Sequence, residues 1–240
     1  MQLIYKVGGC VRDKIMKVVP KDIDYVFIND DEINIGQAYD NMRNYLINNK
    51  YKIFLETKDC YTIRAKDENN ITADYVLARK EIGYHEGTRK PICIPGNLYD
   101  DLERRDFTIN AIAEDKDGNY YDYFDGIHDI KNKILRTQID PHISLNDDPL
   151  RIIRAIRFKI TKEFIFSEEL KEAFNNEAIW NKLSKVVSKE RIRDELYKCF
   201  AHDTISTIKF INGLADYQIK ILFGNNLWLK PTFEKTNKPN

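Results

Sequence analysis

Two aspartates near the amino terminus have the spacing of a metal-binding pair. Asp22 and Asp24 are two residues apart in a segment typical of a strand, so both side chains should point to one face. Carboxylates a few ångströms apart repel each other and raise each other's pKa, and a divalent cation relieves that repulsion. Mg²⁺ favours carboxylate oxygens completed by substrate phosphates. Asp74, on another predicted strand, is the candidate third carboxylate of a two-metal catalytic arrangement.

A glycine pair precedes these aspartates in the stretch VGGCVRD. Gly8 and Gly9 are expected to end a short strand and to lead into a helix, whose first backbone N–H groups are free to hold a phosphate. Each pattern alone has an ordinary alternative, because a glycine pair also makes plain turns and paired aspartates also occupy solvated strand faces. Together, within one strand–turn–helix–strand unit, they predict a nucleoside triphosphate seated over a metal ion.

The segments that must position these residues indicate a mixed α/β domain followed by helices. Apolar and β-branched runs predict strands at residues 3–9, 22–28, 52–56, 60–65 and 71–78, and helical periodicity predicts a helix over 36–49. We therefore expect a mixed α/β domain over residues 1–138, an all-helical region over 139–225, and a polar tail over 226–240.

The remaining segments give one long loop and two helix starts. Residues 80–100 carry three glycines and two prolines without a period, which predicts a long loop of the kind that is often functional. From Asn146 onward the pattern is helical, and Asp148 followed by Pro149 predicts a helix start. Ser188 is expected to cap a later helix.

Composition excludes several function classes. Lys plus Arg and Asp plus Glu number 38 each in 240 residues, so net charge favours neither a nucleic-acid nor a membrane partner. We expect no secretory signal and no membrane span, because no apolar run approaches the roughly 18 residues needed. The four cysteines lack CxxC spacing, which favours reduced thiols in a cytoplasmic protein over disulfides or a zinc site. The oligomeric state is not predictable.

Five motifs, in order, resemble those of the class II tRNA nucleotidyltransferases, the CCA-adding enzymes related to bacterial poly(A) polymerases. They are GGCVRD with DID, RRDFTIN at 104–110, DYFDGIHDI at 122–130, DDPLRIIRAIRF at 147–158 and SKERIRDEL at 188–196. The resemblance spans residues 3 to about 200 and implies a polymerase β-like nucleotidyltransferase head with a mixed sheet, followed by an all-α neck and body. The resemblance implies longer proteins with helical body and tail domains, and most of the tail is expected to be missing from this chain.

The resemblance also assigns roles to residues of this chain. It implies that Asp22 and Asp24 hold Mg²⁺ and that Asp148 and Arg151 form an amino-acid template for the base of CTP or ATP. With the candidate third carboxylate proposed above, the predicted catalytic set is Asp22, Asp24 and Asp74. The full set of nucleotide-binding residues that it implies is Gly8, Gly9, Arg12, Arg105, Asp106, Asn110, Asp148, Arg151, Arg154 and Arg157.

Helix geometry independently supports the template. Residues 148, 151 and 154 fall along one helix face, where an aspartate can accept from an exocyclic amine and an arginine can donate to the base edge. Cytosine and adenine both present an amine beside an acceptor nitrogen, so one pair suits both and rejects uracil and guanine. Alternatives remain open: Asp148 as a plain helix cap, Arg154 and Arg157 on a solvated face, and Arg105 in a salt-bridged corner.

The predicted partners are the 3′ end of tRNA together with CTP and ATP, with Mg²⁺ as cofactor. Eight Lys and Arg against three Asp between Ile130 and Lys162 fit contacts to RNA phosphates. The predicted reaction is CCA addition or repair with release of pyrophosphate. CC-adding, A-adding and poly(A) polymerase activities use the same head in this family, and a non-catalytic RNA- or nucleotide-binding relative is a further alternative.

Overall fold

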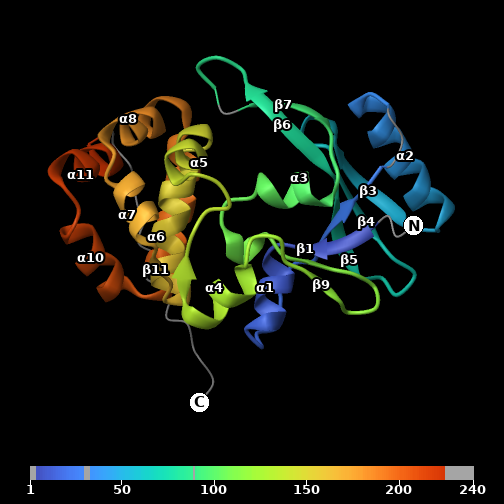
Figure 1. Ribbon diagram of the computed structural model, residues 1–240, viewed down its shortest axis with the longest axis horizontal. Helices are drawn as coiled ribbons and strands as arrows, with labels where there is room; N and C mark the ends of the chain where they lie inside the picture. The colour runs from blue at the N-terminus through green and yellow to red at the C-terminus, as the bar shows by residue number, and fades with distance from the viewer. Residues whose placement is uncertain (1–3, 30–32, 89, 225–240) are drawn as a thin grey trace.

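The computed structural model describes residues 4–29, 33–88 and 90–224 and places a sheet-containing part beside a helical part (Figure 1). The main sheet has seven strands in the order β3-β4-β5-β2-β1-β8-β9. Its strands are β1 (Ile4–Val7), β2 (Asp24–Phe27), β3 (Lys52–Thr57), β4 (Thr62–Lys66), β5 (Thr72–Leu77), β8 (Ala113–Glu114) and β9 (Tyr120–Tyr121). This mixed sheet with a helical region confirms the predicted fold class.

One strand pair in this sheet decides where the acidic residues meet. β2 and β5 run parallel, and their register places Asp24 directly beside Asp74. The other ladders of the sheet are antiparallel, including β1 with β2, in which Val7 opposes Asp24. The predicted strand over 22–28 begins later than expected, because β2 starts at Asp24 and Asp22 lies in the bend just before it.

Two apolar clusters cover the sheet. Adjacent residues of β2 belong to different clusters, Phe27 to the one around α2 (Ile35–Asn48) and Val26 to the one around α3 (Leu98–Glu103). Since neighbouring side chains of a strand point to opposite faces, the two helices serve opposite faces of the sheet. An Asn34–Gln37 capping box fixes the start of α2.

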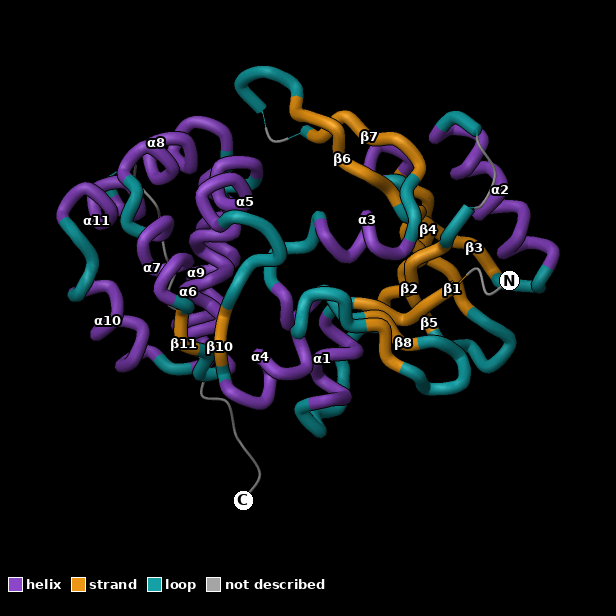
Figure 2. Tube along the Cα trace, viewed as in Figure 1, coloured by secondary structure: helices purple, strands orange, loops and turns teal. Residues whose placement is uncertain are grey.

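The helical part gathers on the left of Figure 2, where most segments are purple. It shares its core with α1, the first helix of the sheet-containing part. Cys10 and Val11 of α1 belong to the same buried cluster as Phe158 and Trp180. Besides α2 and α3, the described residues form the helices α1 (Gly9–Ile15), α4 (Gly126–Asn132), α5 (Pro141–Asp147), α6 (Leu150–Lys162), α7 (Glu168–Phe174), α8 (Glu177–Val186), α9 (Lys189–His202), α10 (Thr204–Asn212) and α11 (Asp216–Phe223). Two 3₁₀ turns, at Lys58–Cys60 and Thr108–Asn110, and a short pair formed by β10 (Ile134–Leu135) and β11 (Ile165–Phe166) complete the fold.

The prediction of a long loop over residues 80–100 is wrong. This segment forms an antiparallel hairpin of β6 (Arg79–Tyr84) and β7 (Pro91–Pro95), followed by α3. Prolines are tolerated because the hairpin has only two strands, so each has an unpaired edge, and Pro91 and Pro95 stand at the two ends of β7. Gly83 follows the irregularity in the ladder.

The predicted start of the helical region is corrected by the structure, and the predicted polar tail is not covered by the described residues. Helical structure begins before Asn146, because α4 and α5 precede it, and seven residues in each are too few to show a periodic pattern. The predicted polar tail lies outside the described residues. Within the three described ranges, every helix is too short or too polar to cross a membrane.

Candidate active site

The acidic centre of the site lies where β2 and β5 pair. Asp24 and Asp74 stand side by side in the parallel register, and Asp22 precedes Asp24 by two residues. Burial raises the pKa of the Asp24 carboxyl, and the negative charges of Asp74 and Asp22 raise it further, while Arg105 partly offsets both effects. The charges of both Asp22 and Asp74 therefore act on Asp24.

Asp74 differs from Asp22 and Asp24 because an arginine side chain pairs with it. Arg64, its neighbour on β4, donates from Nε to Oδ1 at 2.7 Å and from Nη2 to Oδ2 at 2.6 Å. This bidentate pair occupies both carboxylate oxygens. The catalytic role assigned to Asp74 stays a prediction; in this arrangement each of its oxygens accepts a bond from Arg64, and its charge acts on Asp24.

The residues present fit Mg²⁺ as a two-carboxylate site. Among the residues that the structure describes, no three acidic, histidine or cysteine side chains are grouped to hold a metal. Mg²⁺ in nucleotide enzymes is commonly bound by one or two carboxylates plus substrate phosphates. Asp22 and Asp24, with the excess negative charge that raises the pKa of Asp24, supply that donor set.

The glycine turn lies directly beneath an arginine. Gly8 has φ of 75°, a left-handed conformation that favours glycine, and caps the start of α1. A methyl group at Gly8 would lie 2.8 Å from Nη1 of Arg105 and 4.0 Å from Oδ2 of Asp24. The missing side chain is thus what lets Arg105 approach the acidic centre. Arg105 is also paired with Asp101, so the salt-bridged corner and a place in the site are compatible.

Gly8→Ala should separate backbone strain from this close approach. We expect strain of about 1–3 kcal/mol from the positive φ, together with a weaker affinity for nucleotide because Arg105 must move. Gly118→Ala is the matched control, since Gly118 also has positive φ but a methyl group there meets nothing within 4 Å. Thermal unfolding and nucleotide titration of both variants make the test. Equal nucleotide affinities in the two variants would contradict the steric role.

A continuous chain of polar contacts joins α1 to α6. Arg12 Nη1 donates to Asn110 Oδ1 at 2.6 Å, and Asn110 Nδ2 donates to Asp106 Oδ1 at 2.8 Å. Arg154 then donates to Asp106 Oδ2 from Nε at 2.8 Å and from Nη2 at 2.5 Å. Burial alone would raise the pKa of Asp106, but Arg154 and Asn110 hold it far below the usual value of an aspartate. Four sequence-predicted residues therefore form one network.

The same network continues to α9. Glu195 pairs with Arg157 at 2.5 Å and with Arg154 at 3.9 Å, and accepts from Lys198 at 2.8 Å. The guanidinium groups of Arg12, Arg154 and Arg157 lie 5.2, 5.9 and 4.5 Å from the ring centre of Phe158, distances at which cation–π attraction operates. Arg154 and Arg157 are thus anchored in the structure and do not lie on a solvated helix face.

Asp106→Asn should destabilise the protein at neutral pH and much less in acid. Removing one member of a buried, hydrogen-bonded charge pair costs about 3–5 kcal/mol. Because the folded-state pKa of Asp106 lies far below its unfolded value, this contribution is complete above about pH 4 and declines gradually from there down to the folded-state pKa, so that it is partly lost at pH 3. Urea unfolding of wild type and variant from pH 7 to pH 3 measures it. A constant difference across that range would contradict the assignment.

The two template residues lie at the start of α6. Asp148 separates α5 from α6, and its Oδ1 accepts from the backbone N–H of Leu150 at 3.2 Å, so it does cap the helix in part. Arg151 is buried and donates from Nη1 to Ser144 Oγ at 2.5 Å and from Nη2 to the carbonyl of Arg104 at 2.6 Å. Burial raises the pKa of Asp148, and Arg151 lowers it in part, which places the two charges near each other.

Asp148 and Arg151 line a pocket of about 540 Å³. The β6–β7 hairpin, the 3₁₀ turn after β3, and α9 supply the other walls. Tyr84 donates to Glu81 at 2.6 Å, and the charge of Arg151 reaches Tyr84. The remaining lining residues are Asp59, Cys60, Tyr61, Arg79, Lys90, Pro91, Cys93, Arg104 and Arg191. The pocket has the size and mixed polarity of a small-molecule site.

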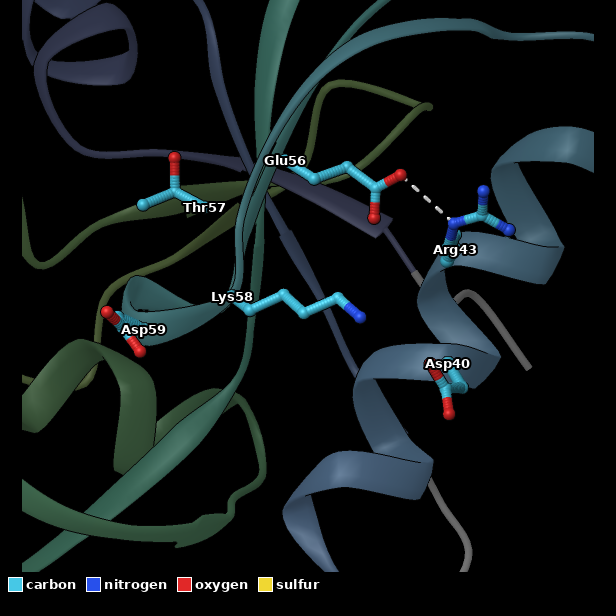
Figure 3. Close-up of a pocket in the computed structure, with 6 residues that line it drawn as sticks. All are labelled: Asp40, Arg43, Glu56, Thr57, Lys58 and Asp59. Carbon is cyan, nitrogen blue, oxygen red and sulfur yellow. Dashed lines mark hydrogen bonds and ion pairs between the residues drawn. The ribbon is translucent and has the colours of Figure 1, made fainter.

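A second pocket of about 640 Å³ lies elsewhere, between α2 and the end of β3, and is shown in Figure 3. Arg43 donates to Glu56 at 3.1 Å at its edge, and Asp40 and Lys58 also line it. None of the residues predicted from the sequence lines this pocket. We therefore place the candidate active site at the acidic centre and the 540 Å³ pocket.

Sequence reasoning missed several residues that hold the predicted ones. Arg64 pairs with Asp74, Asp101 pairs with Arg105, and Glu195 pairs with Arg157. Glu195 lies inside the fifth motif and Asp101 lies four residues before Arg105, so the spacing of a helical ion pair was a usable signal for Asp101. Arg64 depends on strand register, which the sequence alone did not fix.

A mixed sheet with paired aspartates beside a glycine turn, joined to a helical neck, defines the polymerase β-like nucleotidyltransferases. The chain belongs to the poly A polymerase head domain family, whose family model matches residues 4–136. The chain is similar to a CCA-adding enzyme of Staphylococcus aureus, with 34% identity over 205 residues that cover 81% of this chain and 45% of the relative. These matches confirm the class II resemblance drawn from the five motifs.

Solved structures show the same architecture. A CCA-adding enzyme in an apo form superimposes with a TM-score of 0.74 at 28% identity, covering 92% of this chain and 50% of that one. The Thermotoga maritima CCA-adding enzyme complexed with tRNA gives a TM-score of 0.68 at 25% identity, covering 95% of this chain and 50% of that one. The chain spans about half the length of the relatives it matches.

Proposed function

We propose that this chain is a template-independent RNA nucleotidyltransferase that adds nucleotides from CTP and ATP to the 3′ end of tRNA. In the proposed reaction the terminal 3′-hydroxyl attacks the α-phosphate, the α–β phosphoanhydride bond breaks, and pyrophosphate leaves. The single observation that carries the proposal is the network from Arg12 through Asn110 and Asp106 to Arg154. It joins α1, which follows the glycine turn, to α6, which bears Arg151 and begins just after Asp148.

Each part of the site has a distinct task in this proposal. Gly8, Gly9 and Arg105 hold the triphosphate, Asp106 and Asn110 support the ribose, and Asp148 and Arg151 read the base edge. Asp22 and Asp24 would hold Mg²⁺, which when bound neutralises charge on the phosphates and lowers the pKa of the attacking hydroxyl. Arg64 and Arg105 limit the repulsion that Asp24 meets from its neighbours.

The similar proteins support tRNA as the proposed substrate. The S. aureus relative is a CCA-adding enzyme, and the T. maritima structure holds tRNA. A CCA product requires cytosine and adenine to be accepted at one site, which is what an aspartate–arginine pair can do. The four cysteines are free, which supports a working place in the reducing cytoplasm.

The direct test is incubation with tRNAs that lack three, two or one of the terminal nucleotides, with labelled CTP, ATP or both. We expect each tRNA to be extended to the complete CCA end and no further. Extension that stops before adenosine would identify a CC-adding enzyme. Addition of one adenosine and no cytidine would identify an A-adding enzyme, and addition of a long run of adenosines would identify a poly(A) polymerase. Binding of nucleotide without any extension would identify a non-catalytic relative.

A further inference from the structure

We propose that Asp101 is a positioning residue that sets both halves of the nucleotide site at once. It acts on the triphosphate half through Arg105 and on the base half through Arg104. The proposal rests on the proposed nucleotidyltransferase function, and it concerns a residue outside the predicted site.

Asp101 is a fully buried carboxylate between two arginines. Its side chain is 0% exposed, and its two oxygens face different partners. Oδ1 accepts from Nη2 of Arg104, and Oδ2 accepts from Nη2 of Arg105 at 2.7 Å and from Nε at 3.2 Å. Consecutive guanidinium groups would otherwise repel each other, so this carboxylate is what holds both in place.

The helix that carries Asp101 is firmly seated. α3 begins in a capping box between Asn97 and Asp100, and Leu98 and Leu102 are buried against the sheet in the cluster that includes Val26. Asp101 therefore has a fixed place from which to orient its partners. A buried charge on a rigid element costs desolvation energy that is recovered only through such contacts.

The Arg105 half reaches the acidic centre. Nη1 of Arg105 lies above Gly8, and the charge of Arg105 lowers the pKa of Asp24. The two nitrogens nearest to Asp101, Nε and Nη2, leave Nη1 directed toward the glycine turn. Without Asp101, the guanidinium loses the fork that orients it over the triphosphate.

The Arg104 half reaches the base pocket. Its carbonyl oxygen accepts from Nη2 of Arg151 at 2.6 Å, and its side chain lines the 540 Å³ pocket beside Arg151. Arg151 is thus held from one side by Ser144 and from the other by the carbonyl of Arg104, the residue whose side chain pairs with Asp101. One carboxylate therefore couples the phosphate end to the base-reading end.

Equilibrium binding of CTP, ATP and UTP to Asp101→Asn tests this without any RNA. We expect CTP affinity to fall at least about tenfold and the preference for CTP over UTP to fall by a similar factor, in a variant whose circular dichroism is native. Asp100→Asn is the matched control, because Asp100 is the neighbouring acid on α3 and asparagine can still accept the Asn97 N–H of the cap. The Asp100 side chain pairs with Lys80 and with neither arginine, and its backbone bond from Arg104 is unaffected by the substitution. The control should bind as wild type.

The outcomes separate cleanly. Unchanged CTP affinity or unchanged base preference in Asp101→Asn would overturn the proposal, as would the same losses in Asp100→Asn. If Asp101→Asn does not fold, Arg105→Gln should weaken CTP binding and Arg104→Gln should reduce base preference, and failure of either contradicts the coupling. Wild type that binds CTP selectively but extends no tRNA would overturn the proposed function and leave this inference standing.

Discussion

Asp24→Asn should abolish nucleotide incorporation while leaving the protein folded. Losing one of two metal-binding carboxylates removes several kcal/mol of transition-state stabilisation, which is about a thousandfold in rate at 1.4 kcal/mol per tenfold. The structure adds an expectation about stability. Because burial and the charges of Asp74 and Asp22 raise the pKa of Asp24, its ionised form is unfavourable in the folded protein. The uncharged variant should therefore be as stable as wild type or more so.

Single-turnover extension of tRNA and thermal unfolding at pH 7 measure the two effects together. Asp117→Asn, a change of an exposed aspartate in the turn before β9, is the control and should alter neither. Incorporation within tenfold of wild type in Asp24→Asn would remove Asp24 from the catalytic centre. Loss of activity together with a large loss of stability would show that Asp24 has a structural role.

Asp148→Asn should change which base is accepted more than it changes stability. Asparagine still accepts the backbone N–H of Leu150, so the cap survives, but its amide also presents donors where a carboxylate only accepts. Discrimination against UTP and GTP should fall by about 1–3 kcal/mol, or roughly 5- to 150-fold. Misincorporation assays with each nucleotide measure this directly.

The control for Asp148→Asn is Asp140→Asn, because Asp140 caps α5 by accepting from His142 and lies outside the pocket. It should leave selectivity unchanged. Retained discrimination in Asp148→Asn, with reduced stability, would favour the plain capping role. Arg151→Ala is a poorer probe, since its contacts with Ser144 and Arg104 mean that its loss also disturbs the fold.

The sequence predicted the parts of the fold whose signals are local. The helix over 36–49 and most of the strands were found because their apolar periodicity is strong. The β6–β7 hairpin was missed because its glycine and prolines resemble those of a loop, and only the pairing of its two strands makes them compatible with a ladder. Pairing of this kind depends on contacts that no short window contains.

The candidate site divides in the same way. The sequence analysis identified four acidic site residues, namely Asp22, Asp24, Asp74 and Asp148. The structure places Asp24 directly beside Asp74 in the register of β2 and β5. The arginine that pairs with each carboxylate was not predictable. The pair of Arg64 with Asp74 depends on the β4–β5 register, and the pair of Arg157 with Glu195 depends on the packing of α6 against α9. The functional assignments of these residues remain predictions.

The contact between Asp106 and Arg154 has a consequence for cooperativity. Asp106 belongs to the region predicted as the head, and Arg154 and Glu195 belong to the region predicted as the neck and body. Severing the chain at residue 138 would leave the buried Asp106 carboxylate in one fragment and its partner Arg154 in the other, and would divide the apolar cluster shared by α1 and α6. We therefore expect the two regions to melt in a single transition, as one thermodynamic unit.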